Sequence, residues 1–145
     1  MSAEEIKALA HRWFDEWNKG KAAFMAVVDE LHATDIVTHG GSDEETRGLN
    51  DFKQDCSDVF NAFPDVHCTI RDMVAEGDKV AIRYTWTGTH KGELKGTLPT
   101  NKKVAMWEII IDRIAGGKIA EIWTRYDTLG FMQQLGLAPT SEKER

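Results

Sequence analysis

The sequence lacks several features that mark whole classes of protein. Only two of its 145 residues are cysteines, Cys56 and Cys68, and they are not in CxxC spacing, so no disulfide framework is expected. No apolar signal region follows Met1, and no apolar run approaches the roughly eighteen residues of a membrane span. We therefore expect a cytoplasmic protein without membrane contact, in which both cysteines act as small buried hydrophobic residues.

A dense stripe of Lys and Arg is also absent. The net charge is -6, which argues against nucleic acid as a partner. The sequence has no internal repeat, linker or low-complexity segment. Because 41% of the residues are hydrophobic, a chain of this length can bury one continuous core. We predict a single domain of residues 1–139, followed by a polar tail of residues 140–145.

The first part of the chain has the apolar spacing of helices. Ser2 is an N-cap candidate, and the long helix that it starts is predicted to end at Gly20. The apolar face of this helix comprises Ile6, Leu9, Ala10, Trp13, Phe14 and Trp17. A short second helix is predicted over 21–31 and a third over 48–62, with a brief strand over 33–41 between them that ends in a glycine loop.

From residue 66 onward the apolar period changes to two, which is typical of strands. The predicted strands run from 66 to a turn at 76–78, and then over 79–90, 104–114 and 118–126. One face of the first is predicted to hold Cys68, Ile70 and Asp72, and one face of the second Val80, Ile82, Tyr84 and Trp86. Gly116 and Gly117 suit a tight hairpin between the last two strands. The pattern predicts an α+β fold in which a curved antiparallel sheet is covered on one face by helices.

Several phrases occur in the order and spacing of one known family. They are residues 17–20, 35–39, 63–65, 76–80, 88–90, 99–103, 113–114 and, most specifically, 117–136. On these phrases the chain resembles the SnoaL-like polyketide cyclases and predicted ester cyclases. The resemblance implies a nuclear-transport-factor-2-like cone, an α+β barrel in which the sheet wraps around the N-terminal helices and leaves a hydrophobic pocket at its open end.

The resemblance also implies a chemistry. Cyclases of this family close a ring by an internal aldol step on a small hydrophobic carbonyl compound and need no metal or organic cofactor. One base removes a proton next to a carbonyl and a donor stabilises the enolate. The polar pair usually given this work is a His on the penultimate strand and an Asp on the last strand. Those places hold Ile110 and Thr124 here, so the usual mechanism is not carried over.

A replacement acid is available on the same strand face. If Ile110 faces the pocket, the period of two puts Glu108 beside it. The other residues expected to line the pocket are Phe14, Trp17, Ile122, Thr124 and Tyr126. The alternative for Glu108 is a carboxylate solvated at the pocket rim. Asp112 shares its phase, but beside Arg113 it is expected to be a surface ion pair or a turn residue.

His39 is the second catalytic candidate, because the family often places a His there, facing the cavity entrance. Its alternative is a loop histidine that bonds to its own backbone. His90 either rims the cavity or faces solvent in a hairpin. The remaining histidines show no metal-ligand spacing and are expected on exposed faces: His11, His32 and His67. Asp127 stands where the family keeps an acid, and its simpler role is the N-cap of the last helix.

The tryptophans bear on both core and partner. Most of Trp13, Trp17, Trp86, Trp107 and Trp123 are expected in the core. Trp123 has the opposite phase to Thr124 and is expected to face outward. The resemblance implies a homodimer that pairs two such sheets, buried partly through Trp123.

Two functions from different classes remain open at this point. The first is cofactor-free proton transfer or ring closure on a small hydrophobic carbonyl compound. The second is a binding or sequestering protein whose cavity has lost the acid-base pair. A third possibility is a dimerising scaffold with a closed core and no cavity.

Overall fold

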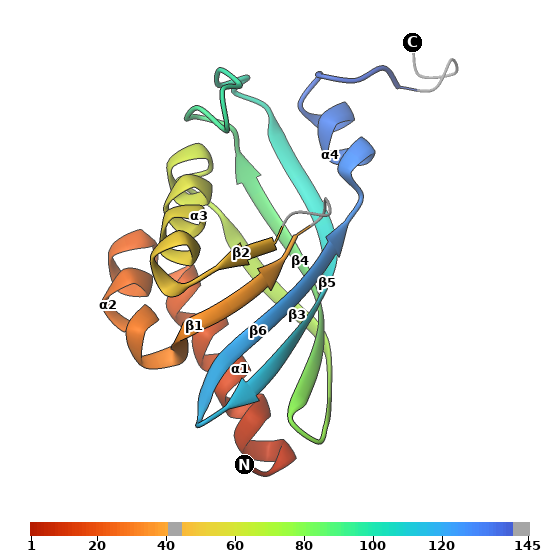
Figure 1. Ribbon diagram of the computed structural model, residues 1–145. Helices are drawn as coiled ribbons and strands as arrows, with labels where there is room; N and C mark the ends of the chain where they lie inside the picture. Colours follow the sequence, from red (N-terminus) through yellow and green to blue (C-terminus); the bar gives the residue numbers. More distant parts are fainter. Residues whose placement is uncertain (41–44, 141–145) are drawn as a thin grey trace.

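The computed structural model describes residues 1–40 and 45–140 of the chain (Figure 1). Its elements, in chain order, are α1 (Ala3–Asn18), α2 (Lys21–Leu31), β1 (His32–His39), β2 (Glu45–Arg47), α3 (Leu49–Ala62), β3 (His67–Glu76), β4 (Lys79–Thr89), β5 (Lys103–Ala115), β6 (Lys118–Tyr126) and α4 (Thr128–Gln134). The predicted α+β class, with helices before strands, is confirmed. Gly41 and residues 141–145, which carry parts of the predicted glycine loop and polar tail, lie outside the described residues, and the division at residue 139 stays a prediction.

Helix α1 starts and ends through specific side-chain contacts. The Ser2 hydroxyl accepts a hydrogen bond from the Glu5 backbone N–H at 3.1 Å, and the Glu5 carboxylate accepts one from the Ser2 N–H, also at 3.1 Å. This capping box satisfies N–H groups that the first helical turn leaves free. At the other end, the Asn18 amide bonds both the carbonyl and the N–H of Cys68, each at 2.8 Å. Asn18 therefore ties the end of α1 to strand β3.

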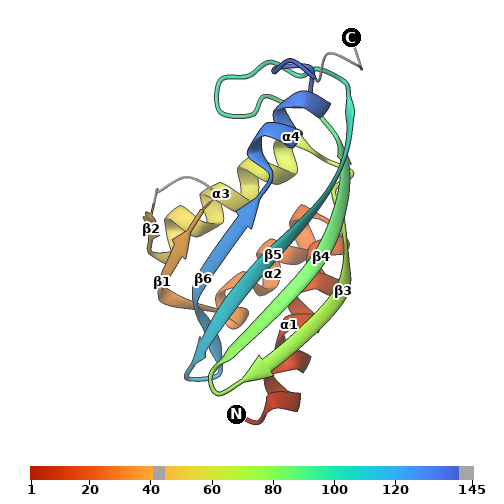
Figure 2. The same ribbon diagram turned by 90° about the vertical axis from the view of Figure 1, so that its right-hand side faces the viewer.

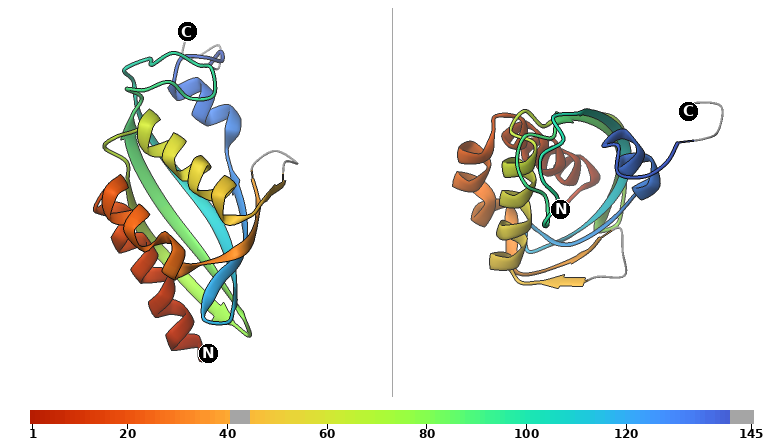
Figure 3. Two further views of the ribbon diagram at one scale, coloured as in Figure 1. Left: turned by 60° about the vertical axis from the view of Figure 1, so that its left-hand side comes forward. Right: turned by 90° about the horizontal axis from the view of Figure 1, so that it is seen from above.

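The strands form one curved sheet in the order β2-β1-β6-β5-β4-β3, with the helices on its concave side (Figures 1 and 3). Two details differ from the predicted antiparallel barrel. Strand β1 pairs with β6 in parallel, and the chain crosses from one to the other through α3 and four further strands. The sheet also stays open, since edge strands β2 and β3 are not paired with each other. Helix α1 packs against β3 and helix α3 against β1, so the helices cover the concave side between the two edges.

A β-bulge in β3 changes which residues face inward. Ile70 pairs with Tyr84, but Asp72 pairs with Arg83, so the register shifts between Ile70 and Asp72. The prediction that Asp72 shares a face with Ile70 is therefore wrong. The extra residue turns Asp72 to the outer face, where its carboxylate bonds Arg83 Nε at 2.6 Å, and Met73 takes the inward position opposite Ile82.

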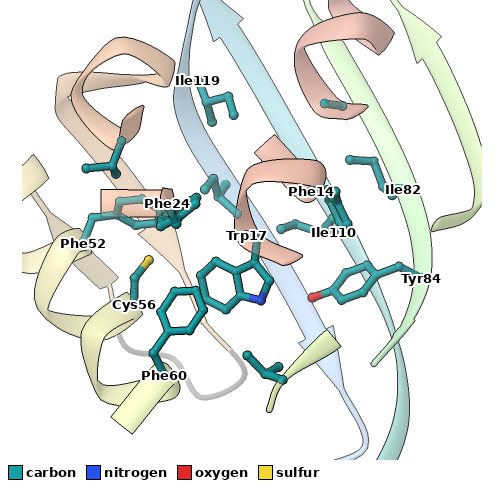
Figure 4. Packing of buried hydrophobic residues seen from close by; sticks show 14 of the residues in the cluster. Phe14, Trp17, Phe24, Phe52, Cys56, Phe60, Ile82, Tyr84, Ile110 and Ile119 are labelled. Atoms are coloured by element: carbon teal, nitrogen blue, oxygen red, sulfur yellow. The ribbon is translucent and has the colours of Figure 1, made fainter. Parts of the chain in front are cut away.

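The core lies between the concave face of the sheet and the helices. Val80, Ile82 and Tyr84 of β4 are buried as predicted, and Cys56 of α3 is buried with them. Aromatic rings of α1, α2 and α3 meet here: Trp17 packs on Phe60 at a ring distance of 4.2 Å. Figure 4 shows these side chains converging from the helices and the strands.

The opposite, outer face of the sheet is uncovered by the helices, as Figure 2 shows for β3, β4 and β5. Trp107 is 61% exposed on this face, so its expected place in the core is wrong. Strand residues alternate between faces, and Trp107 has the opposite phase to Glu108. Trp123 pairs with the exposed Ile111 and thus faces outward, as predicted.

The open end of the cone is built from the β4–β5 loop (residues 90–102) and α4 (Figure 3). The N–H groups of Lys91 and Gly92 donate to the Ala62 carbonyl at 2.9 and 3.2 Å, which holds the loop on the end of α3. A side chain at Gly92 would place its Cβ 2.0 Å from the Asn61 carbonyl oxygen, so only glycine permits this approach. The N-cap role of Asp127 in α4 is confirmed, because its Oδ1 accepts from the Gly130 N–H at 2.8 Å.

Candidate functional site

A cavity of about 340 Å³ lies at the open end of the cone, between the helices and the inner face of the sheet. We call this cavity the pocket. Fifteen residues line it, and eight of them are aromatic. Only two lining residues are charged, Glu108 and Lys95. A small apolar compartment with few polar groups is the usual character of a small-molecule site.

Glu108 is the acid of the pocket, and two donors on the neighbouring strand hold it. Tyr84, its cross-strand partner, donates its hydroxyl hydrogen to Oε2 at 2.6 Å, and Trp86 donates its indole N–H to Oε1 at 2.7 Å. Burial raises the pKa of Glu108, because the charged form loses its hydration; the two hydrogen bonds act in the opposite direction. The result is an oriented carboxyl group that holds a proton more readily than an exposed glutamate.

Two further polar atoms belong to pocket residues and have no protein partner. The indole nitrogen of Trp17 and the hydroxyl of Thr124 are buried without a hydrogen bond, and both residues line the pocket. The Thr124 hydroxyl lies close enough to Glu108 to favour its charged form, but it forms no hydrogen bond of acceptable geometry. Figure 4 shows the Trp17 nitrogen and the Tyr84 hydroxyl turned towards each other. Buried polar groups normally form hydrogen bonds with protein or water. The Trp17 nitrogen and the Thr124 hydroxyl can therefore form hydrogen bonds with a ligand in the pocket.

The structure places the other expected pocket residues at two depths. Phe14, Trp17, Thr124 and Tyr126 line the pocket with Glu108. Ile110 and Ile122 share the inner face but lie in the core, 4% and 5% exposed, and are not pocket-lining residues. The prediction that both isoleucines line the pocket is therefore wrong, because they are packed in the core beneath the helices.

His39 lies away from the pocket. It pairs with Trp123, and the two rings stack at 5.4 Å with an angle of 9°. Its Nε2 contacts Glu121 Oε2 at 2.7 Å, and Glu121 also binds Arg113. The prediction that His39 faces the cavity entrance is wrong, because β1 pairs in parallel with β6 and so puts His39 on the outer face with Trp123.

Asp112 does not lie at the surface beside Arg113, as the sequence predicts. It is fully buried and accepts a hydrogen bond from the indole N–H of Trp13 at 3.1 Å. Burial raises the pKa of Asp112 to about 7. The sequence does contain a sign of this position, because Asp112 alternates in phase with Glu108 and Ile110, which face inward. Arg113 points to the other face, where it binds Glu121 at 3.0 Å.

Two histidines are also buried against expectation. His32 is fully buried where an exposed position was expected, and its Nδ1 contacts the Val28 carbonyl at 3.0 Å. Burial lowers the pKa of His32 to about 4, so the ring is neutral. His90 is fully buried rather than solvent-facing, with its Nδ1 next to the Thr100 hydroxyl at 3.1 Å, and it does not line the pocket. His11 and His67 are exposed as predicted.

Two other cavities in the described part of the chain offer fewer groups that could act on a ligand. One, of about 470 Å³, surrounds the start of α3 and contains Asp29, Arg47 and Lys53. Another of the same size contains Asp65, Thr89 and Gln134, and there Thr89 already satisfies both Asp65 oxygens at 2.7 Å. Neither contains an unpartnered buried polar atom. The pocket with Glu108 is therefore the candidate site.

Residues 1–40 and 45–140 contain neither a cluster of metal ligands nor a membrane-spanning helix. No group of three or more His, Cys, Asp or Glu in that part of the chain has the arrangement of a metal site. No helix there is both long enough and apolar enough to cross a bilayer. The cytoplasmic location expected from the sequence stays a prediction.

Comparison of the sequence with known protein families identifies the family of this protein. The sequence model of the SnoaL-like polyketide cyclases matches residues 7–135, which is most of the chain. The protein belongs to this family. The resemblance inferred from the sequence phrases is thereby confirmed.

Several solved structures are similar to this protein over nearly the whole chain. AclR, a candidate hydroxylase from Streptomyces galilaeus, is 30% identical with a TM-score of 0.81, over 95% of this chain and 100% of that chain. IdmH, a candidate polyketide cyclase from Streptomyces antibioticus, is 27% identical with a TM-score of 0.75, over 90% and 98%. A candidate SnoaL-like polyketide cyclase from Jannaschia sp. has a TM-score of 0.86 at 22% identity, over 95% of each chain, and supports the fold alone. Among proteins with curated descriptions, none matches the sequence.

Proposed function

We propose that this SnoaL-like protein binds a small apolar carbonyl compound in the pocket and catalyses proton transfer on it without a cofactor. The observation that carries the proposal is Glu108, a buried carboxyl group held between Tyr84 and Trp86 in an otherwise apolar cavity. Burial raises the pKa of Glu108 above the ordinary value, so this carboxyl group takes up a proton more readily, as an acid-base catalyst must.

The proposed reaction uses groups that already line the pocket. The charged form of Glu108 removes a proton from the carbon next to the ligand carbonyl, and the electron pair of that C–H bond forms an enolate. The Trp17 N–H, which has no protein partner, and the Thr124 hydroxyl, which lies beside Glu108, donate to the enolate oxygen. The enolate carbon then either takes the proton back at the same or a conjugated position, or attacks a second carbonyl of the ligand to close a ring. Glu108 returns its proton in either case.

The related proteins also favour a carbonyl compound as the ligand. The family description and the IdmH title both name polyketide cyclases, whose substrates carry several carbonyl groups. Ile110 and Thr124 stand where the family's His and Asp are expected, so Glu108 takes over the acid-base role in this proposal. A scaffold with a closed core fits the cavity of about 340 Å³ poorly.

Deuterium exchange into 2-tetralone tests the proposal. This bicyclic ketone is small and apolar, and its protons next to the carbonyl exchange slowly in D₂O, so proton NMR measures a rate with and without protein. We expect the protein to accelerate exchange at the carbon next to the carbonyl. Saturable binding without acceleration would favour the sequestering protein instead, and absence of both binding and exchange would contradict the proposal.

We also propose that a second copy of the chain covers the outer face of the sheet. The exposed apolar residues of β5, namely Trp107, Ile109 and Ile111, form a strip there that continues to Trp123 on β6. Charges of both signs border the strip: Arg83 and Arg125 flank Ile109, and Glu121 lies two residue pairs beyond Ile111. An apolar centre with both signs at its rim is self-complementary, as a two-fold interface requires.

Substituting Trp107→Glu is expected to convert the dimer into a monomer. It introduces a charge at the centre of the apolar strip, where burial without a partner costs several kcal/mol. Light scattering coupled to size-exclusion chromatography measures the mass. Leu98→Glu, at another exposed apolar residue, on the β4–β5 loop, is the matched control and should stay dimeric. A wild-type monomer at high micromolar concentration would contradict the proposed dimer.

A further inference from the structure

The second charged residue of the pocket is a lysine at the mouth. Lys95 lies on the β4–β5 loop and is exposed, whereas Glu108 is held inside on the sheet. We infer that Lys95 is a specificity-determining residue, which makes the pocket prefer a carbonyl ligand with a carboxylate at its outer end. This inference rests on the proposed function and adds the charge of the ligand to it.

The backbone holds Lys95 at the tip of a small hairpin. Leu94 and Thr97 bond each other through both backbone pairs, at 2.9 and 2.8 Å, so Lys95 and Gly96 are the two residues of the turn. Their φ angles are 46° and 86°, which is the left-handed region. Turns of this type strongly prefer Asn, Asp or Gly at the first position. A lysine there costs conformational energy and is not what the turn itself selects, which points to a role for its side chain.

The same hairpin forms part of the pocket wall. Leu94 lines the pocket next to Lys95, and the base of the loop is held to the Ala62 carbonyl by Lys91 and Gly92. The tip is therefore attached to the end of α3 through its own backbone. A charge carried on this tip has a defined place at the mouth.

The ammonium group of Lys95 forms no ion pair with another described residue. None of the ion pairs among the described residues involves Lys95. The acid influenced by the charge of Lys95 is Asp55 on α3. Burial raises the pKa of Asp55, and the charge of Lys95, the next largest influence, lowers it. Asp55 accepts a hydrogen bond from Thr46 at 3.3 Å. Lys95 is thus left to neutralise a ligand.

The two charges give the pocket a direction. A carboxylate is repelled by the charged form of Glu108 and attracted by Lys95, so an acidic ligand is oriented with its carboxylate at the mouth and its apolar part inside. A carbonyl further along the ligand then lies on the side of Glu108. The expected substrate class is a keto acid whose apolar part has about the size of two fused rings.

Two isosteric probes separate charge from shape. 2-Naphthoate and 2-acetylnaphthalene have the same ring system and number of heavy atoms, and differ in replacing a carboxylate oxygen by a methyl group. Quenching of the pocket tryptophans measures binding of each. We expect wild-type protein to prefer 2-naphthoate, Lys95→Gln to bind it about fivefold more weakly, and 2-acetylnaphthalene to bind both proteins equally. Lys95→Arg should keep the preference, and Lys91→Gln, at an exposed lysine of the same loop, should not alter it.

The outcomes distinguish this inference from the function beneath it. If both probes bind but Lys95→Gln weakens them equally or not at all, the inference is overturned while the apolar pocket stands. If 2-naphthoate binds no better than 2-acetylnaphthalene to wild-type protein, the inference is likewise overturned. If neither probe binds, the proposed function fails and the role of Lys95 falls with it. Loss of the preference at high salt would support the ionic contact.

Discussion

Substituting Glu108→Gln is expected to lower the rate of deuterium exchange into 2-tetralone by about 10²–10⁴-fold, the range for removing a general acid-base group. The amide cannot accept the proton that the carboxylate takes. Affinity for 2-tetralone should stay within about threefold, because the apolar walls that bind it are unchanged. Single-turnover exchange rates followed by NMR and binding measured by tryptophan quenching provide the two readouts.

The hydrogen bonds around Glu108 explain why this variant should fold. The Trp86 indole is a donor only, so the Gln carbonyl oxygen must take its place at 2.7 Å. The Gln NH₂ then faces the Tyr84 hydroxyl, which can rotate and accept instead of donating. Both contacts to residue 108 can therefore persist, and only the Tyr84 hydroxyl hydrogen loses the acceptor that Glu108 provides.

A second variant separates catalysis from packing. Tyr84→Phe removes the donor that favours the charged form of Glu108, so the pKa of Glu108 should rise further. Because the charged form is the base, the rising limb of the pH–rate profile should move to higher pH while Glu108→Gln has no such limb. Equal exchange rates for wild type and Glu108→Gln would remove Glu108 from the mechanism.

The second large effect concerns stability and is expected from Asp112. Its pKa is about 7 in the folded protein, whereas an unfolded aspartate has a pKa near the ordinary value of 3.8. The folded state therefore binds more protons between these two values, and its stability falls as the pH rises through this range. Below pH 4 the contribution vanishes, and above pH 7 the destabilisation is complete.

Asp112→Asn should remove this pH dependence. The amide oxygen can still accept from the Trp13 indole, now at 3.1 Å from Asp112, but the side chain no longer ionises. The free energy of unfolding of Asp112→Asn relative to wild type should rise by about 4 kcal/mol between pH 4 and pH 8, from about three pH units at 1.36 kcal/mol each. Urea unfolding across this pH range measures the difference.

The comparison must be between variant and wild type because His32 has the opposite effect. Its pKa is lowered to about 4 from the ordinary 6.5, so the unfolded state binds more protons and stability rises with pH between these values. Asp112 and His32 thus largely offset each other in the wild-type protein between pH 4 and pH 6.5. Asp112→Asn should uncover the rise due to His32. Parallel curves for variant and wild type would contradict the assigned role of Asp112.

The periodic parts of the structure follow from local spacing. The three N-terminal helices and the long strands lie close to their predicted ranges, because an apolar face repeats every 3.6 residues in a helix and every two in a strand. The same reasoning correctly put Glu108 and Thr124 on the side of the pocket. The hydrogen-bond partners of Glu108 could not be predicted from the sequence, because Tyr84 and Trp86 reach it only through the register of β4 against β5.

The predicted side-chain orientation is wrong where the alternation along a strand is interrupted, or where the pairing with another strand decides which face is inside. The bulge at residues 70–72 reverses Asp72, and the parallel pairing of β1 with β6 puts His39 outside. For Asp112, a neighbouring arginine suggested a surface pair, although alternation alone placed it with Glu108. A strand's period says which residues share a face, but only its neighbours say which face is inside.

The amino-acid order by itself determined the elements, the family and the face on which the acid of the pocket lies, because these depend on spacing along one chain. Tertiary structure decided which groups surround that acid, which polar side chains are sealed from water, and where a cation is held at the mouth. Those properties depend on contacts between distant segments: β4 brings the donors to Glu108, α1 covers Asp112, and the end of α3 supports the loop that carries Lys95. Desolvation and hydrogen bonding, which set the proton affinity of a carboxyl group, exist only once those segments have met.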